Sequence, residues 1–254
     1  MQLAVEVPIP ELKNFEDVVD FDFCLAHLCE DKSYKQYFKD RAAMGRMVFL
    51  DNSVWELSHP LSQGQLIKLG KEIGATHIVS PDILDDCRRT VANAEEFIQD
   101  VSFCTPVGVV QGQTNDERIE CYTALVLLGY RFISFPLTPL LPQIEREEER
   151  VKLFKTLRSR RLHSPNVKYH LMTLDVVATL WTYANYGVAY VDTRLPIHCA
   201  RQGKLLTEAT VRPPKQPLDL TKPFSDEIRL MAIENVRRLA ELCAKTRKKN
   251  GNKK

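Results

Sequence analysis

Polar side chains that can do chemistry recur where short apolar runs of this sequence end. Three aspartates and a Gln-Gly pair occupy such positions: Asp51, Asp82, Asp192, and Gln111 with Gly112. Aspartate is a common turn and helix-capping residue, so any one of them alone is explained by local structure. Three carboxylates together would suit displacement at the anomeric carbon of a sugar, because one can attack the carbon while another handles protons. Clustered aspartates also suit Mg²⁺, so divalent-metal binding is the competing interpretation.

The residues beside these aspartates favour a flat ligand. Asp51 opens the segment DNSVWE, in which Trp55 offers an aromatic ring for stacking. Gln111 offers a side-chain amide and Gly112 an uncluttered backbone, and both can hydrogen-bond a planar ligand. A further carboxylate could accept hydrogen bonds from the N–H groups of a purine-like base. These residues would therefore suit a purine-like base and its sugar, and divalent-metal binding stays open as the competing interpretation.

The elements that must position these residues alternate between strand and helix. Seven strands are predicted from short apolar runs, at 21–27, 47–50, 77–80, 106–110, 131–135, 168–172 and 189–191, and an eighth within 204–211. Helical patterns are predicted at 62–74, 87–100, 115–128, 145–161, 176–186 and 225–244. This alternation with short turns is typical of a parallel sheet, and a (β/α)₈ barrel needs about 250 residues. We therefore predict an α/β protein with one TIM-type barrel domain over 1–244, whose strand ends share one rim.

Helix ends and charge runs add detail to this barrel. Ser62 and Ser225 are placed to cap the N-termini of two helices, and Gly74 is placed to stop one. The run EREEER at 145–150 is predicted to lie on the solvated face of its helix. The last ten residues carry six of the basic groups, so a net charge of +2 becomes −4 without them. We expect 245–254 to be a disordered basic tail, and the body is not a generally basic nucleic-acid binder.

Several classes of protein are disfavoured by what the sequence lacks. It has no basic and apolar leader and no run of about 18 apolar residues, which predicts a cytoplasmic protein without a membrane partner. Its seven cysteines are scattered and form no CxxC pair, which favours reduced thiols and no structural zinc. No GxGxxG or P-loop pattern is present, which disfavours a nucleotide cofactor.

Five blocks in order, between Asp51 and Leu206, resemble the tRNA-guanine transglycosylase superfamily. They read LDNSVWEL, VSPDILDD, VGVVQGQTNDERIECYTALVLLGY, YHLMTL and VDTRLPIHCARQGKLL. The chain is most similar to the short phage members proposed to modify DNA (the DpdA-like type). The resemblance implies a TIM barrel and a base-exchange glycosyltransferase that needs no redox cofactor or ATP.

The resemblance also implies roles for the strand-end residues. Asp192 would be the nucleophile that attacks C1′ and expels guanine, and Asp51 the general acid and base. Asp82 and Gln111 would read the base, assisted by backbone near Gly112 and Leu137. The incoming base would be a 7-deazaguanine of the preQ0 type, and it would use the same site in a ping-pong exchange.

Departures from the family pattern bear on the substrate. The tRNA-type members carry a zinc module of three cysteines and a histidine after the nucleophile, and here only Cys199 and Cys243 lie beyond Asp192. Since that module helps to hold tRNA, we expect DNA, with its guanosine flipped out or single-stranded. The family's Gly-Gly after the fifth strand is replaced by the sequence FPL at 135–137, which leaves base specificity open there.

Basic residues behind Asp192 are the candidates for gripping the nucleic acid. We expect four of them to hold phosphate near the flipped nucleotide: Arg194, His198, Arg201 and Lys204. The segment SRRLH at 159–163 adds a second basic cluster. Alternatives remain open: the same chemistry on tRNA, hydrolysis of the glycosidic bond without replacement, and a non-catalytic partner subunit. The sequence also leaves open whether two copies of the chain pair as a homodimer.

Overall fold

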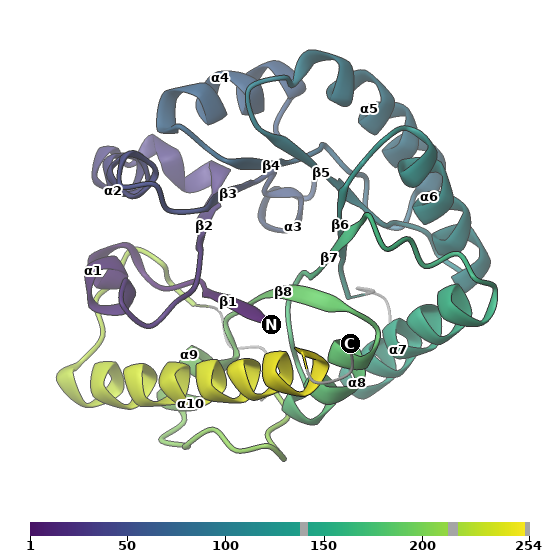
Figure 1. Cartoon of the computed structure of the whole chain (residues 1–254). Helices are drawn as coiled ribbons and strands as arrows, with labels where there is room; N and C mark the ends of the chain where they lie inside the picture. The colour runs from purple at the N-terminus through teal and green to yellow at the C-terminus, as the bar shows by residue number, and fades with distance from the viewer. Residues whose placement is uncertain (138–141, 213–217, 252–254) are drawn as a thin grey trace.

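The computed structural model describes residues 1–137, 142–212 and 218–251. Eight parallel strands are hydrogen-bonded in the order β1-β8-β7-β6-β5-β4-β3-β2 and roll into a nearly closed barrel surrounded by helices (Figure 1). The strands are β1 (Gln2–Val5), β2 (Asp22–Leu25), β3 (Val48–Asp51), β4 (His77–Val79), β5 (Thr105–Val109), β6 (Phe132–Phe135), β7 (Lys168–Leu171) and β8 (Val188–Thr193). The prediction of a single-domain (β/α)₈ TIM-type barrel is confirmed.

Helices of very different length follow the strands. The longer ones are α2 (Lys32–Ala43), α4 (Gln63–Ile73), α5 (Cys87–Asp100), α6 (Asn115–Leu127), α7 (Gln143–Ser159) and α10 (Asp226–Gly251). The shorter ones are α1 (Leu12–Phe15), α3 (Val54–Leu57), α8 (Leu180–Asn185) and α9 (Leu195–Arg201), with 3₁₀ turns at Ile9–Glu11, Ala26–Glu30 and Val177–Thr179. The predicted cap of α4 is confirmed, because Ser62 and Gln65 form a reciprocal capping box. Gly74 ends α4 with a φ of +71°, which favours glycine.

The eighth strand is not where the sequence suggested. It is β1, at the start of the chain, and it pairs with β8 so that Ala4 lies opposite Asp192. The segment 204–211 contains no strand and contributes only an isolated bridge at Val211. β1 carries no alternating pattern because three of its four residues are buried.

A side chain bridges the seam between β1 and β2. The backbone N–H of Asp20 donates to Leu3 O at 2.8 Å, and the carboxylate of Asp20 accepts from Leu3 N–H at 2.9 Å. The chain entering β2 therefore hydrogen-bonds β1 without a ladder between the two strands themselves.

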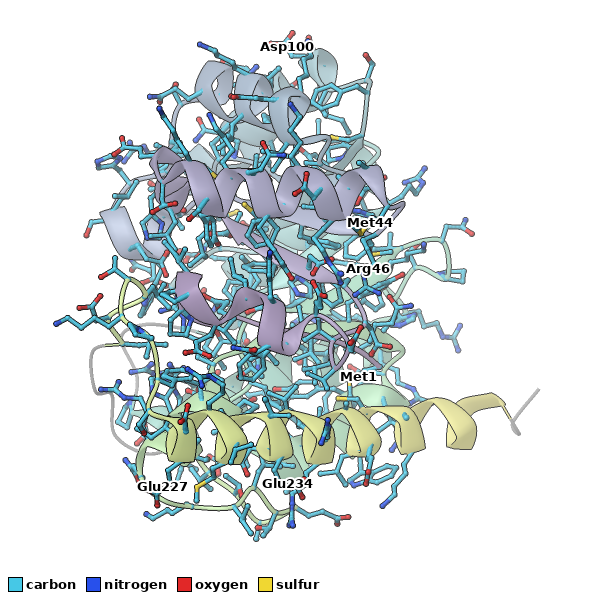
Figure 2. The ribbon with its side chains drawn as sticks, turned by 90° about the vertical axis from the view of Figure 1, so that its left-hand side faces the viewer. Met1, Met44, Arg46, Asp100, Glu227 and Glu234 are labelled. Atoms are coloured by element: carbon cyan, nitrogen blue, oxygen red, sulfur yellow. The ribbon has the colours of Figure 1, made fainter. Side chains whose placement is uncertain are left out.

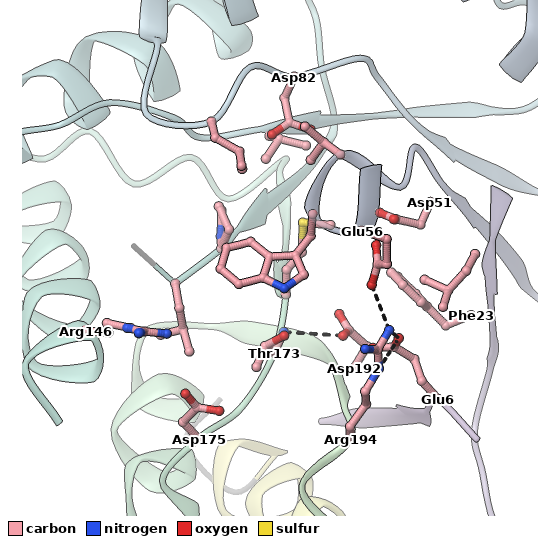
Figure 3. A pocket seen from close by; sticks show the side chains of 18 of the residues that line it. Glu6, Phe23, Asp51, Glu56, Asp82, Arg146, Thr173, Asp175, Asp192 and Arg194 are labelled. Carbon is pink, nitrogen blue, oxygen red and sulfur yellow. Dashed lines mark hydrogen bonds and ion pairs between the residues drawn. The ribbon is translucent and has the colours of Figure 1, made fainter. Parts of the chain in front are cut away.

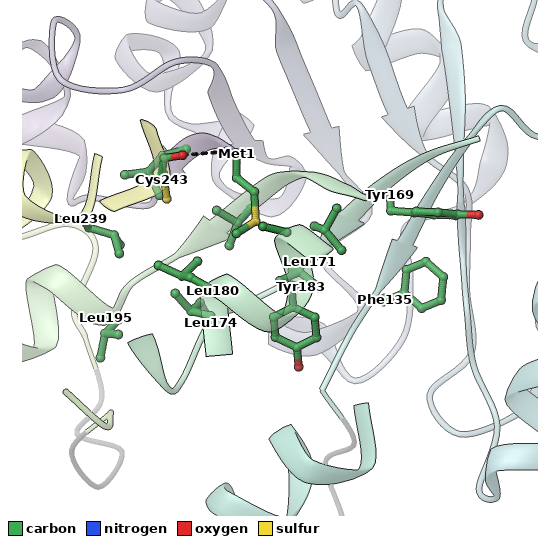
Figure 4. Packing of buried hydrophobic residues seen from close by; sticks show 14 of the residues in the cluster. Met1, Phe135, Tyr169, Leu171, Leu174, Leu180, Tyr183, Leu195, Leu239 and Cys243 are labelled. Carbon is green, nitrogen blue, oxygen red and sulfur yellow. Dashed lines mark hydrogen bonds between the residues drawn. The ribbon is translucent and has the colours of Figure 1, made fainter. Parts of the chain in front are cut away.

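Aromatic rings fill much of the barrel interior. The Phe49 ring is central, with centroids of His77, Phe21 and Phe132 at 4.4, 5.0 and 5.1 Å. A second apolar cluster lies outside the strands, where α8, α9 and α10 pack together beside β1, β7 and β8; Figure 4 shows Met1 and Leu171 within it. Close packing on both sides of the strands fixes the positions of the residues at the strand ends.

The EREEER run at 145–150 was predicted to lie on the solvated face of its helix. That prediction for α7 is wrong in part, because two residues of the run are buried. Glu147 and Arg150 are both almost fully buried, and Arg150 donates to both Glu147 oxygens at 3.0 Å. The same guanidinium donates to the carbonyls of Phe135 and Met172 at 3.1 Å. The helix face turns inward there because Arg150 satisfies backbone carbonyls where β6 and β7 end.

The closing helix is longer than predicted. α10 lies across one side of the barrel in Figure 2, with Glu227 and Glu234 pointing away from the strands. Ser225 caps it, since its hydroxyl accepts from the Ile228 N–H at 3.3 Å. The helix continues to Gly251, so the predicted helix end at 244 is wrong, and 252–254 lie outside the described residues.

Candidate active site

A cavity of about 310 Å³ opens at the carboxyl ends of the strands, the face on which TIM barrels place their sites. Residues at or just after the ends of all eight strands line it. Among them are five of the residues predicted from sequence: Asp51, Asp82, Gln111, Leu137 and Asp192. Figure 3 shows Asp51 and Asp82 on one side of the cavity, across from Asp192. Its volume is at the small end of the range for small-molecule sites, about 300–1,000 Å³.

Asp51 is buried at the end of β3, in surroundings that favour its protonated form. Its Oδ2 accepts from the backbone N–H of Ser53 at 2.8 Å, in a tight turn where Ser53 has a φ of +60°. Its Oδ1 is buried and makes no hydrogen bond to any described residue. Burial, and then the nearby carboxylate of Glu56, raise the pKa of Asp51 well above its usual range. A protonated Asp51 is chemically suited to general acid catalysis.

Asp192 is buried near the end of β8 and faces N–H groups. Its Oδ2 accepts from the Thr173 backbone N–H at 3.3 Å. Its Oδ1 lies 3.0 Å from Nε2 of His170, a β7 side chain with no exposed surface. An aspartate carboxylate held in this way at the rim of the cavity could act as a nucleophile.

Asp82 and Gln111 form one hydrogen-bonded unit. The Gln111 amide donates to Asp82 Oδ2 at 2.5 Å, and the Asn52 amide donates to Asp82 Oδ1 at 2.6 Å. The Gln111 carbonyl oxygen accepts from the Asp85 N–H at 3.1 Å. Burial raises the pKa of Asp82 to about 6, although both amides lower it. Gln111 and Asn52 therefore fix the carboxylate of Asp82 at the cavity wall, and both Asp82 and Gln111 line the cavity.

Three pocket carboxylates were missed from sequence: Glu6, Glu56 and Asp175. Glu6 follows β1, the strand that was itself missed, and Glu56 lies on α3, five residues after Asp51. Arg194 joins them: its Nε donates to Glu6 Oε2 at 2.7 Å and its Nη2 donates to Glu56 Oε1 at 2.8 Å (Figure 3). Burial raises the pKa of Glu6 to about 7, against the lowering effect of Arg194. The strand-end rule applied to β1 would have found Glu6.

The four predicted phosphate-gripping residues are not brought together. Arg194 lies inside the pocket, where it donates to the carboxylates of Glu6 and Glu56. His198 lines the pocket, where its Nε2 lies 2.9 Å from Nη2 of Arg212, a residue that also bonds Asp175. Residues 195–200 of α9 are buried, and this includes His198, which lines the cavity. Arg201, the last residue of α9, and Lys204 after it do not line the cavity.

Two further predictions concern the base. Trp55 lies on the pocket lining with 43% of its surface exposed, where a ring can meet a ligand. Gly112 lies outside the pocket lining, and its carbonyl accepts from Arg118 Nε at 2.9 Å. A Cβ at Gly112 would lie 2.8 Å from the Glu117 Cβ, so close packing against α6 explains this glycine.

In the described ranges, no group of three or more His, Cys, Asp or Glu side chains is arranged to hold a metal ion. Within the same ranges, no helix is both long and apolar enough to cross a bilayer. All seven cysteines are free thiols.

Comparison with known proteins adds no relative to this picture. The chain matches no protein-family model and no curated protein. The function is therefore inferred from the fold, the site and the five sequence blocks.

Proposed function

We propose that this chain is a DNA guanine transglycosylase. It exchanges a guanine in DNA for a 7-deazaguanine base of the preQ0 type through a covalent Asp192–glycosyl intermediate. The observation that carries the proposal is that two carboxyl groups with different surroundings share one cavity. Burial raises the pKa of Asp51 well above its usual range, whereas Asp192 accepts from the Thr173 backbone N–H and lies 3.0 Å from Nε2 of His170.

The exchange runs in two balanced steps. An oxygen lone pair of Asp192 forms a bond to C1′ while the bond from C1′ to guanine breaks, and the departing base takes its electron pair and the proton of Asp51. The incoming 7-deazaguanine then gives its N–H proton to Asp51 and bonds to C1′. The ester bond to Asp192 breaks and returns its electron pair to the carboxylate. One glycosidic bond replaces another, so no outside energy source is required.

The cavity suits a base with its sugar rather than a larger ligand. Trp55 offers a face for stacking, and the ionised carboxylate of Asp82 can accept the N–H groups of a guanine edge. Such a pocket requires that the nucleotide leave the stack before Asp192 can reach C1′. Arg201 and Lys204, outside the pocket, remain the proposed contacts to phosphates of the flanking strand.

An exchange assay tests this function. Labelled 7-deazaguanine is incubated with the chain and with duplex DNA, single-stranded DNA or tRNA, and the incorporated label is counted. We expect incorporation into DNA, its loss in Asp192→Ala and Asp51→Asn, and its retention in Asp116→Asn, which removes an exposed carboxylate. Incorporation into tRNA alone would reject the DNA substrate, and base release without incorporation would indicate a hydrolase. Binding without either would indicate a partner subunit.

A further inference from the structure

A buried histidine beneath Asp192 links three neighbouring strands. His170 on β7 lies opposite Ser134 of β6 in the strand register, and Asp192 extends from β8 on the other side. Ser134 Oγ lies 2.8 Å from His170 Nδ1, and His170 Nε2 lies 3.0 Å from Asp192 Oδ1. At most 2% of the surface of any of the three residues is exposed.

The surroundings of His170 leave it few partners. The rings of Phe49, Phe21, Phe23 and Phe132 surround it, with centroids between 5.4 and 6.4 Å away. Apolar rings cannot satisfy the ring nitrogens, and a buried polar atom without a partner is costly. Its nitrogens therefore depend on Ser134 and Asp192.

His170 Nε2 and Asp192 Oδ1 are within hydrogen-bonding distance, but their orientation does not form a hydrogen bond. His170 Nε2 and Asp192 Oδ1 each lack a well-formed hydrogen bond to any described residue, although they are 3.0 Å apart. Catalytic hydrogen bonds in a ligand-free site are often poorly aligned and tighten when the substrate is present.

The groups on either side of the His170 ring, Asp192 and Ser134, determine which ring nitrogen carries the hydrogen. An ionised carboxylate can only accept, so the hydrogen must be on Nε2 of His170. In the neutral imidazole Nδ1 then accepts, and the Ser134 hydroxyl is the donor that fixes this tautomer. The Thr173 backbone N–H holds the other carboxylate oxygen.

We infer that His170 is a positioning residue that holds the side chain of Asp192 aimed at the sugar, with Ser134 setting the tautomer of His170. This inference rests on the proposed function. In the first step Asp192 becomes an ester and loses its charge, so the His170 hydrogen bond weakens. In the second step the carboxylate is restored and the hydrogen bond strengthens again, which favours release of the sugar to the incoming base.

Two variants and a control test the role in catalysis. His170→Gln should slow formation of the covalent adduct about 10²-fold, the effect typical of a misplaced reacting group. Its affinity for DNA should stay within a few-fold of the wild type, and Ser134→Ala should slow the reaction about fivefold. The control is His77→Gln, because His77 also contacts Phe49 inside the barrel but does not line the cavity. Equal slowing in the control, or loss of DNA affinity that matches the loss of rate, would overturn the role.

A spectroscopic measurement separates this inference from the proposed function. Histidine labelled with ¹⁵N reports which ring nitrogen carries the proton, and His170→Gln assigns the signal. We expect His170 to be protonated at Nε2, with a resonance that shifts in Asp192→Asn. An unprotonated Nε2 would overturn the inference even in an active enzyme. A wild-type chain that forms no adduct would instead overturn the proposed function, while the tautomer would still decide whether His170 and Asp192 are paired.

Discussion

The buried carboxyl of Glu6 makes the stability of this protein depend on pH in a way that one substitution removes. Burial is the main cause that raises the pKa of Glu6 from 4.5 to about 7. The folded protein therefore binds this proton more tightly than the unfolded chain does. The contribution to the free energy of unfolding is full below about pH 4.5 and is lost as the pH rises through about 7.

The magnitude follows from the two pKa values. The interval between 4.5 and about 7, at about 1.4 kcal/mol for each pH unit, corresponds to ~3 kcal/mol. Glu6→Gln keeps the shape of the side chain and an oxygen for Arg194, but it cannot ionise. The variant should match the wild type near pH 4.5 and should unfold with a free energy ~3 kcal/mol higher at pH 8.

Urea unfolding at both pH values measures this difference. Glu95→Gln is the matched control, because it removes a carboxylate of the same type from the exposed surface of α5. A variant that differs from the wild type equally at pH 4.5 and pH 8 would refute the reasoning. So would a variant that is less stable than the wild type at pH 8, since the Arg194 ion pair would then outweigh the cost of burial.

Three further outcomes follow from the site and its supports. Arg150→Met should lower the free energy of unfolding by about 3–5 kcal/mol in urea, because Glu147 is left buried without its partner; an effect below about 1 kcal/mol would contradict this. Trp55→Ala should weaken binding of the 7-deazaguanine about tenfold in calorimetry, since stacking contributes about 1–3 kcal/mol; unchanged affinity would mean that the ring does not stack. The rate of base exchange should fall as the pH drops below about 6, because Asp82 then takes up a proton and accepts fewer hydrogen bonds; a profile that stays flat from pH 5 to 7 would exclude an ionised Asp82 as the base reader.

Much of the barrel was predictable because its strands and helices carry local signals. Ser62 and Gly74 marked the ends of α4, and seven apolar runs marked seven strands. β1 was missed because four mostly buried residues carry no alternation, and its strand character comes from pairing with β8. The inward turn of Glu147 and Arg150 was hidden for a similar reason, since it depends on carbonyls of two other strands.

The site was predictable to the extent that it depends on barrel topology. Asp51, Asp82 and Asp192 share one cavity because parallel strands deliver their ends to one rim. The role of Arg194 was not predictable, because its partner Glu6 lies 188 residues away in the sequence. Arg194 was predicted to contact phosphate because it is a cation close to the proposed nucleophile. In the structure its guanidinium donates to Glu6 and Glu56.

The covalent intermediate is the central claim, and mass analysis of a trapped adduct tests it most directly. The chain is incubated with guanine-containing DNA, denatured, digested and searched for a peptide that carries a deoxyribose. We predict an adduct on Asp192 that survives denaturation and disappears in Asp192→Ala. The absence of any adduct during active exchange, or an adduct that persists in Asp192→Ala, would contradict the account.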